Sequence, residues 1–71
     1  MDLVIAQKLQ AMTDEAANVD EAYQFDRWSA RVHQFLITAV GTDEAKHFQE
    51  LVAAYWADTV ALRRGYLEGL L

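Results

Sequence analysis

The sequence of 71 residues contains no cysteine and no proline, and it has only three glycines. The lack of cysteine excludes disulfides, and with only two histidines a structural zinc site is not expected. A domain of this length buries only about 60% of the surface that its unfolded chain exposes, so its stability is marginal unless a disulfide, a structural metal or a partner chain adds to it. Because neither a disulfide nor a zinc site is expected, we expect association with a second chain.

Features of catalytic sites are missing too. Ser29 is the only serine, and the sequence has neither a glycine-rich phosphate loop nor a nucleophile elbow. We therefore predict no enzymatic activity and no cofactor. Glu44 and His47 have the Glu-x-x-His spacing of carboxylate-bridged metal bundles, but those bundles need the pair twice, together with a glutamate from each of two further helices. We predict no metal site in the single chain, and whether an oligomer completes one stays open.

The sequence also lacks a long apolar run. A helix that spans a bilayer needs roughly 18 or more apolar residues, and no run here approaches that length. The N-terminus shows no basic segment followed by an apolar block, so no signal peptide is predicted. We expect a cytoplasmic protein without a membrane partner. The formal net charge of −5 opposes contact with phosphate backbones, so nucleic acid is not an expected partner either.

The sequence does contain apolar residues at the spacing of amphipathic helices. Apolar residues recur at spacings of three and four from Ile5 to Val19 and again from Phe25 to Ala39. Gly41 is predicted to end a helix in the left-handed conformation. We predict a single all-α domain over residues 1–71, an antiparallel up-down-up bundle of three helices (2–17, 19–40, and 43–64 or 43–70) completed by oligomerisation. The predicted core comprises Phe25, Trp28, Val32, Phe35, Phe48 and Leu51.

Small residues recur every four positions along the third predicted helix. Such a ridge lets another helix backbone approach closely, although alanine is also simply the best helix former. Glycine costs about 1 kcal/mol relative to alanine inside a helix, so Gly65 and Gly69 favour close packing, unless the helix ends at Arg64 and Gly65 caps it. The predicted interface consists of this ridge and the apolar C-terminus: Ala53, Ala57, Ala61, Gly65, Gly69, Tyr66, Leu67, Leu70 and Leu71.

The arginines suggest a second kind of site. Arg27 and Arg31 have no acidic residue one turn before them, and Glu50 is the expected partner of Arg31 in the folded hairpin. Arg63 and Arg64 are expected near the acidic residues between the first two helices, and this internal charge compensation is the favoured interpretation. The alternative is recognition of a small anion such as a nucleotide. The candidate ligand-binding residues are then Arg27, Arg31, Arg63, Arg64 and Tyr66.

A family resemblance runs through about two thirds of the chain. Its pattern is F-x-x-W-x-x-R-V-x-x-F-L from Phe25, then Gly41, then F-x-x-L from Phe48, and finally RRGYLEGLL. This resembles the helical accessory domain that precedes TIR-type or other effector domains in bacterial abortive-infection and antiviral defence proteins. The resemblance implies a role in assembly or sensing without catalytic residues. We expect either an N-terminal domain of such a protein or a small free-standing protein, for example one encoded by a phage.

These observations lead to one predicted function and two alternatives. We predict a non-enzymatic helical interaction module of prokaryotic or phage conflict systems, which forms a homo-oligomer and can bind a protein partner. The first alternative is a protein that binds or sequesters a small anionic signal. The second is an acidic inhibitor that docks on a basic partner.

Overall fold

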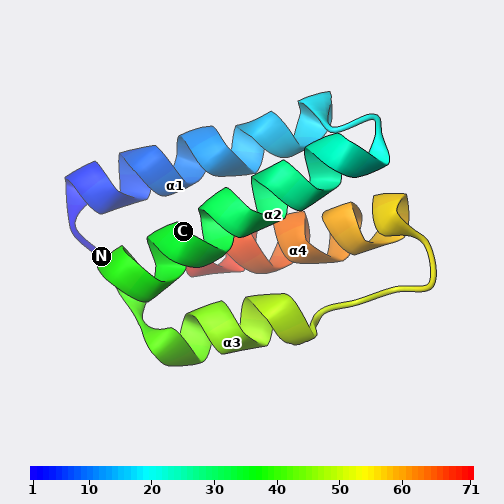
Figure 1. The fold of residues 1–71 in the computed structure, drawn as a ribbon. Coiled ribbons are helices and arrows are strands. Elements are labelled where there is room, and N and C mark those ends of the chain that lie inside the picture. Colours follow the sequence, from blue (N-terminus) through cyan, green and yellow to red (C-terminus); the bar gives the residue numbers. More distant parts are fainter.

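The structure, a computed structural model of residues 1–71, consists of four helices and no strand (Figure 1). The α-helices are α1 (Leu3–Glu15), α2 (Ala22–Phe35), α3 (Thr42–Glu50) and α4 (Trp56–Leu70). Helix α1 continues into a 3₁₀ turn, η1 (Ala16–Asn18), and α2 into a π-helical turn, η2 (Leu36–Val40). The predicted all-α class is confirmed. The predicted count of three helices is wrong, because the third predicted helix is divided into α3 and α4.

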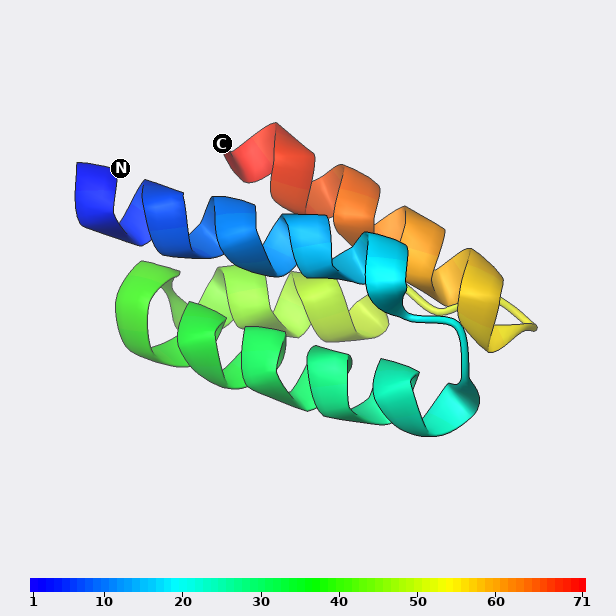
Figure 2. The same cartoon turned by 90° about the horizontal axis from the view of Figure 1, so that it is seen from above.

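Successive helices run in opposite directions, so the chain goes up, down, up and down (Figures 1 and 2). Helix α4 packs against both α1 and α2, and α3 is attached to the end of α2 through η2. The N-terminus and the C-terminus lie toward the same end of the bundle. No helix has both the length and the apolar character that crossing a bilayer requires.

Local capping explains where the first two helices begin. The Asp2 side chain accepts a hydrogen bond of 2.8 Å from the backbone N–H of Val4 and so caps α1. At the start of α2, Glu21 and Gln24 form a reciprocal capping box. Helix α2 therefore begins at Ala22, three residues after its predicted start.

The junction at Gly41 has a different geometry from the one predicted. Its φ of 163° is extended backbone and not left-handed. The N–H of Gly41 donates to the Leu36 carbonyl at 2.7 Å, which closes the π-helical turn. A Cβ at Gly41 would run into the carboxylate of Glu44, whose side chain folds back over this position. The extra residue of the π turn thus turns the chain without a left-handed glycine.

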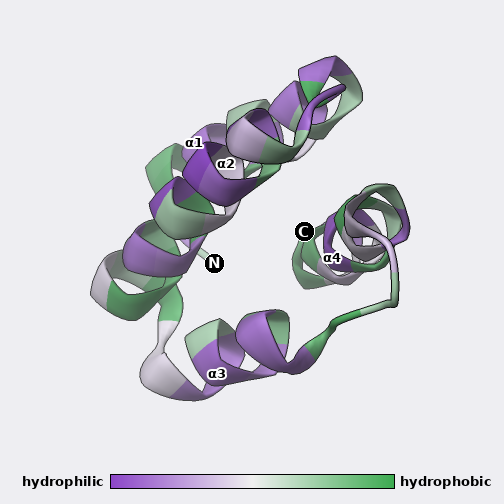
Figure 3. Cartoon of the chain, turned by 45° about the vertical axis from the view of Figure 1, so that its right-hand side comes forward, coloured by the Kyte–Doolittle hydropathy of each residue, from purple (hydrophilic) through white to green (hydrophobic).

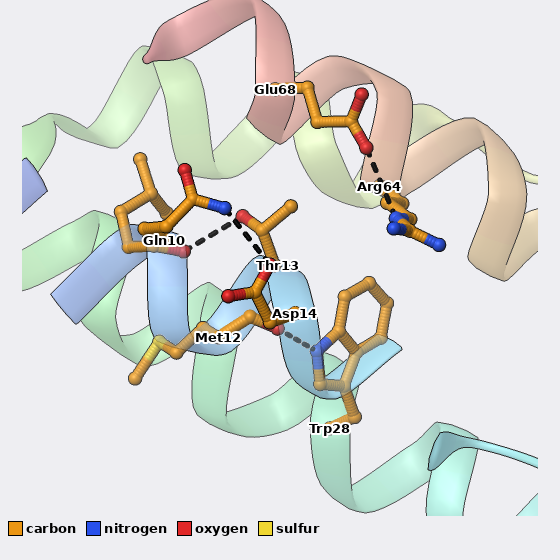
Figure 4. A network of polar contacts seen from close by, with 8 residues as sticks. Gln10, Met12, Thr13, Asp14, Trp28, Arg64 and Glu68 are labelled. Atoms are coloured by element: carbon orange, nitrogen blue, oxygen red, sulfur yellow. Dashed lines mark hydrogen bonds and ion pairs between the residues drawn. The ribbon is translucent and has the colours of Figure 1, made fainter. Parts of the chain in front are cut away.

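The core connects all four helices. Trp28 packs edge-on against Phe48 of α3, with 5.9 Å between ring centroids. Its indole N–H donates to the Met12 carbonyl of α1 at 2.8 Å, as Figure 4 shows. Of the predicted core residues, Trp28, Val32 and Phe48 are buried, whereas Phe25, Phe35 and Leu51 are half-buried. The buried apolar residues are Leu9, Ala16, Trp28, Val32, Leu36, Ala45, Phe48, Val60 and Leu67.

The break between α3 and α4 comprises residues 51–55, and we call it the hinge. The hinge is mostly apolar (Figure 3). Leu51 leaves the helical conformation with φ −80° and ψ 95°. Side chains of α4 bind the backbone on both sides of this point: Arg63 reaches the carbonyls of Gln49 and Leu51, and the Thr59 hydroxyl accepts from the N–H of Ala53 at 2.9 Å. These tertiary hydrogen bonds outweigh the helical preference of the local sequence, which is why the predicted continuous helix is wrong.

Candidate functional site

Three hollows on the surface are lined by four of the five predicted ligand-binding residues, the arginines. The first, the Arg63 cleft, has a volume of about 660 Å³ and lies between α2, the hinge and α4. The second, the α4 groove, has a volume of about 460 Å³ and lies between η1 and the outer face of α4. The third, the Arg27 groove, has a volume of about 440 Å³ and lies between the end of α1 and the first half of α2.

Arg63 is the most unusual residue of the structure, because it is a charged side chain that is only 7% exposed. Its Nε donates to the Leu51 carbonyl at 3.0 Å, one Nη to the Ser29 hydroxyl at 3.0 Å, and the other Nη to the Gln49 carbonyl at 3.2 Å. These bonds use three of its five N–H donors. They tie α4 to α2 and to the end of α3, so Arg63 is first of all a structural cross-link.

The charge of Arg63 is balanced by aromatic rings and carbonyl dipoles. The guanidinium carbon lies 4.8 Å from the ring centroid of Phe48 and 5.4 Å from that of Phe25. Neither ion pair of the structure includes Arg63. Burial lowers the pKa of the Arg63 guanidinium below its ordinary value. The predicted compensation of Arg63 by the acidic residues between the first two helices does not occur.

The other arginines have simpler surroundings. Arg31 forms an ion pair with Glu15 of α1 and not with Glu50, the partner predicted for it. Arg64 pairs with Glu68 one turn later on α4, with 3.1 Å between Nε and Oε1 (Figure 4). Arg27 is exposed and takes part in no ion pair. Both pairs lie on the surface, where such pairs contribute little to stability.

The five predicted ligand-binding residues do not converge. Arg27 and Arg31 line the Arg27 groove, whereas Arg63 and Arg64 line two separate hollows. The fifth, Tyr66, lines none of the three hollows. The structure therefore places the predicted anion-binding residues at several places and not around one ligand.

Tyr66 connects α4 to α3. Its ring stacks on that of His47 with 4.6 Å between centroids, and its hydroxyl donates to the Glu44 carbonyl at 3.5 Å. Burial, and after it the negative charge of Glu44, raise the pKa of the Tyr66 hydroxyl above its ordinary value. The Glu44 side chain lies over Gly41 while His47 stacks on Tyr66, and no three His, Cys, Asp or Glu side chains converge anywhere in the chain.

The small-residue ridge, Ala53, Ala57, Ala61, Gly65 and Gly69, lies mostly at the surface. Ala53 lies in the hinge and not in α4, so the prediction of one helical ridge is wrong at its first member. Ala53 and Ala57 are half-buried and the other three are exposed. A Cβ at Gly65 or Gly69 would meet nothing within 4 Å. Because α4 continues to Leu70, Gly65 lies inside the helix and is not its cap. Gly65 and Gly69 therefore lie within α4, although no contact within the chain requires a glycine at either position.

The apolar C-terminus is divided between the core and the surface. Leu67 is completely buried, so its prediction as an interface residue is wrong, because it packs in the protein's own core. Tyr66 and Leu70 are half-buried, and Leu71 is 47% exposed. Leu62, at 48% exposure, adds an apolar side chain to the exposed surface of α4.

The predictions from the sequence do not include the bonds of Thr59 and Arg63 to the backbone of the hinge: they give Thr59 no polar role, and they expect Arg63 to be compensated by acidic residues or to bind an anion. One signal was available. Thr59 and Arg63 follow the same spacing of three and four as Trp56, Val60 and Leu67, which places both polar side chains on the buried face of α4. A polar residue on a buried face must find hydrogen-bond partners, and here the partners are the hinge backbone and Ser29.

Comparison of the chain with protein-family models, with curated proteins and with solved structures gave no match.

Proposed function

We propose that the protein is a non-enzymatic module that self-associates through the outer face of α4. The observation that supports this proposal is the pair of glycines, Gly65 and Gly69, inside α4 with open space above them. Gly65, in the interior of α4, destabilises the helix by about 1 kcal/mol relative to alanine, and no contact within the chain compensates for this, whereas Gly69 lies in the last turn, where glycine costs less. Close approach of another backbone at the ridge would supply the compensation.

The occupant we propose for this surface is a second copy of α4. Within α4 the ridge is symmetric about Ala61, since Ala57 and Gly65 lie one turn before and one turn after it, whereas Ala53 lies in the hinge. An antiparallel pair of α4 helices related by a two-fold axis would therefore place Ala57 opposite Gly65 and Ala61 opposite its own counterpart. The α4 groove beside it is lined by Ala57, Ala61 and Gly65, which leaves room for side chains of the second copy.

The biological setting that we propose is bacterial or phage conflict. Its support is the residue pattern from Phe25 onward that resembles the accessory domains of abortive-infection and antiviral proteins. In such a setting a self-associating module would bring attached or bound effectors together. This role requires no catalytic residue in the chain itself.

Sedimentation equilibrium of the wild-type protein and of Gly65→Leu tests the proposal. We expect the wild type to be dimeric at micromolar concentration and Gly65→Leu to be monomeric, because the leucine side chain fills the space that the second helix would occupy. The matched control is Ala11→Leu, which places the same side chain at an exposed position of α1. Circular dichroism shows whether each variant is folded. A folded wild type that remains monomeric, or a dimer that Gly65→Leu leaves intact, contradicts the proposal.

A further inference from the structure

The local sequence of the hinge favours a helix. From Gln49 to Ala57 there is no glycine, proline, asparagine, aspartate or serine, the residues from which turns are usually built. Ala53 and Ala54 are the best helix formers, and they lie in the middle of the segment. Nothing in residues 49–57 themselves accounts for a break in the helix.

The backbone of the hinge is also poorly bonded. The N–H groups of Val52, Ala54 and Tyr55 donate to no group of the protein. The Val52 side chain is 68% exposed and that of Tyr55 is 57% exposed. The break is held by α4, through Thr59 and Arg63. If the hinge became helical, these N–H groups would gain acceptors and the Arg63 bonds to Gln49 and Leu51 would be lost.

We propose that the chain forms a second kind of dimer, in which two copies exchange α4. In each copy the hinge is helical, and α3 and α4 form one helix from Thr42 to Leu70, about 44 Å long at 1.5 Å per residue. Exchange of an identical element is a common route to dimers, and short hinges under constraint favour it. The partner is a second copy because only another copy offers the surface of α1 and α2 that α4 covers in the monomer.

The contacts of α4 are compatible with exchange. In the monomer α4 packs on α1 and α2, and it reaches α3 through side chains such as Tyr66 on His47. All of these partners precede the hinge, so the exchanged α4 finds each of them on the second copy. The two hinges would pass each other near the two-fold axis, where the exposed Val52 and Tyr55 gain apolar neighbours. This inference does not depend on the ridge, whose exposed face exchange leaves free.

Thr59 sets the balance between the monomer and the exchanged dimer. Its hydroxyl accepts from the Ala53 N–H at 2.9 Å and lies 3.4 Å from the Ala53 carbonyl, so it holds the hinge in its bent form. Thr59→Val keeps the shape of the side chain and removes these bonds. We expect Thr59→Val to lower the dissociation constant of the exchanged dimer at least about tenfold, because each of the two monomers loses one net hydrogen bond at its hinge. Thr59→Ser keeps the hydroxyl and serves as the matched control.

The test combines sedimentation equilibrium with NMR on a mixture of isotope-labelled and unlabelled protein, refolded together so that chains can exchange. In the exchanged dimer, the nuclear Overhauser contact between the His47 and Tyr66 rings appears between labelled and unlabelled chains. The internal control is the contact between Trp28 and Phe48, which both precede the hinge and must remain within one chain. Adding Ala54→Pro should reverse the effect of Thr59→Val, because proline disrupts a continuous helix and replaces an N–H that the bent hinge leaves unbonded.

Two results would overturn the exchange. One is a Thr59→Val protein that dimerises no more tightly than Thr59→Ser. The other is a dimer in which the His47–Tyr66 contact stays within one chain, which would point to association by the ridge alone. If Thr59→Val does not fold, the refolded wild type at millimolar concentration is examined in the same way, and a monomer there also contradicts the inference. A ridge dimer is lost in Gly65→Leu and kept in Ala54→Pro. The exchanged dimer is kept in Gly65→Leu and lost in Ala54→Pro.

Discussion

The two junctions that flank α3 differ in what determines them. At Gly41 the chain turns through local features: a π-helical turn closed by the Gly41 N–H, and acidic residues in the first turn of α3. At the hinge the local sequence favours a helix, and the chain turns because Thr59 and Arg63 bind its backbone from α4. The first junction forms from near neighbours in the sequence, whereas the second requires α4 to be docked.

Among the substitutions that test the two junctions, the largest effect on stability is expected at Arg63, which holds the hinge. Arg63→Ala removes three hydrogen bonds from a charged donor and should lower the free energy of unfolding by about 3 kcal/mol. Arg64→Ala, the neighbouring control, removes only an exposed ion pair and should change it by no more than about 1 kcal/mol. Urea denaturation followed by circular dichroism measures both. Equal effects would mean that Arg63 does not hold the hinge.

The two junctions also show what could be predicted from the sequence. The all-α class, the stop near Gly41 and the buried Trp28, Val32 and Phe48 follow from periodicity and composition, which are local properties. The break at the hinge could not be predicted in this way. It depends on a hydrogen bond between Arg63 and Leu51, twelve residues apart, and on another between Arg63 and Ser29, which are much farther apart.

The same limit applies to the candidate site. The small-residue ridge is visible as a spacing of four, and the structure places most of it at the surface. The predicted anion site rests on arginines without an acidic residue at helical spacing before them, and the structure separates these arginines because Arg31 pairs with Glu15 of another helix while Arg63 turns inward. The prediction of Leu67 as an interface residue groups the apolar residues at the C-terminus together, although Leu67 continues the spacing of Trp56 and Val60 on the buried face of α4.

A smaller effect is expected at the first junction. Gly41→Ala should change the free energy of unfolding by no more than about 0.5 kcal/mol, because the backbone is extended and the group in the way is the flexible end of Glu44. A left-handed glycine at this position would make the same substitution destabilising by about 1–2 kcal/mol. Thermal and urea unfolding of Gly41→Ala distinguish these two geometries.

The smallest expected effect concerns the contact of Tyr66 with α3. The pKa of its hydroxyl is raised in the folded protein, so the folded state holds the proton more tightly than the unfolded state does. The free energy of unfolding should therefore fall as the pH rises above about 10, the ordinary pKa of tyrosine. Tyr66→Phe should remove this part of the pH dependence. If wild type and Tyr66→Phe lose stability in parallel between pH 9 and 11, the assignment to Tyr66 is wrong.

The central claim is that α4 side chains, and not the local sequence, break the helix at residues 51–55. The ¹³Cα chemical shifts of these residues in the wild type, in Thr59→Val and in Arg63→Ala test it most directly. We predict shifts outside the helical range in the wild type, and movement toward helical values in both variants. Shifts that stay outside the helical range in both folded variants would contradict the account.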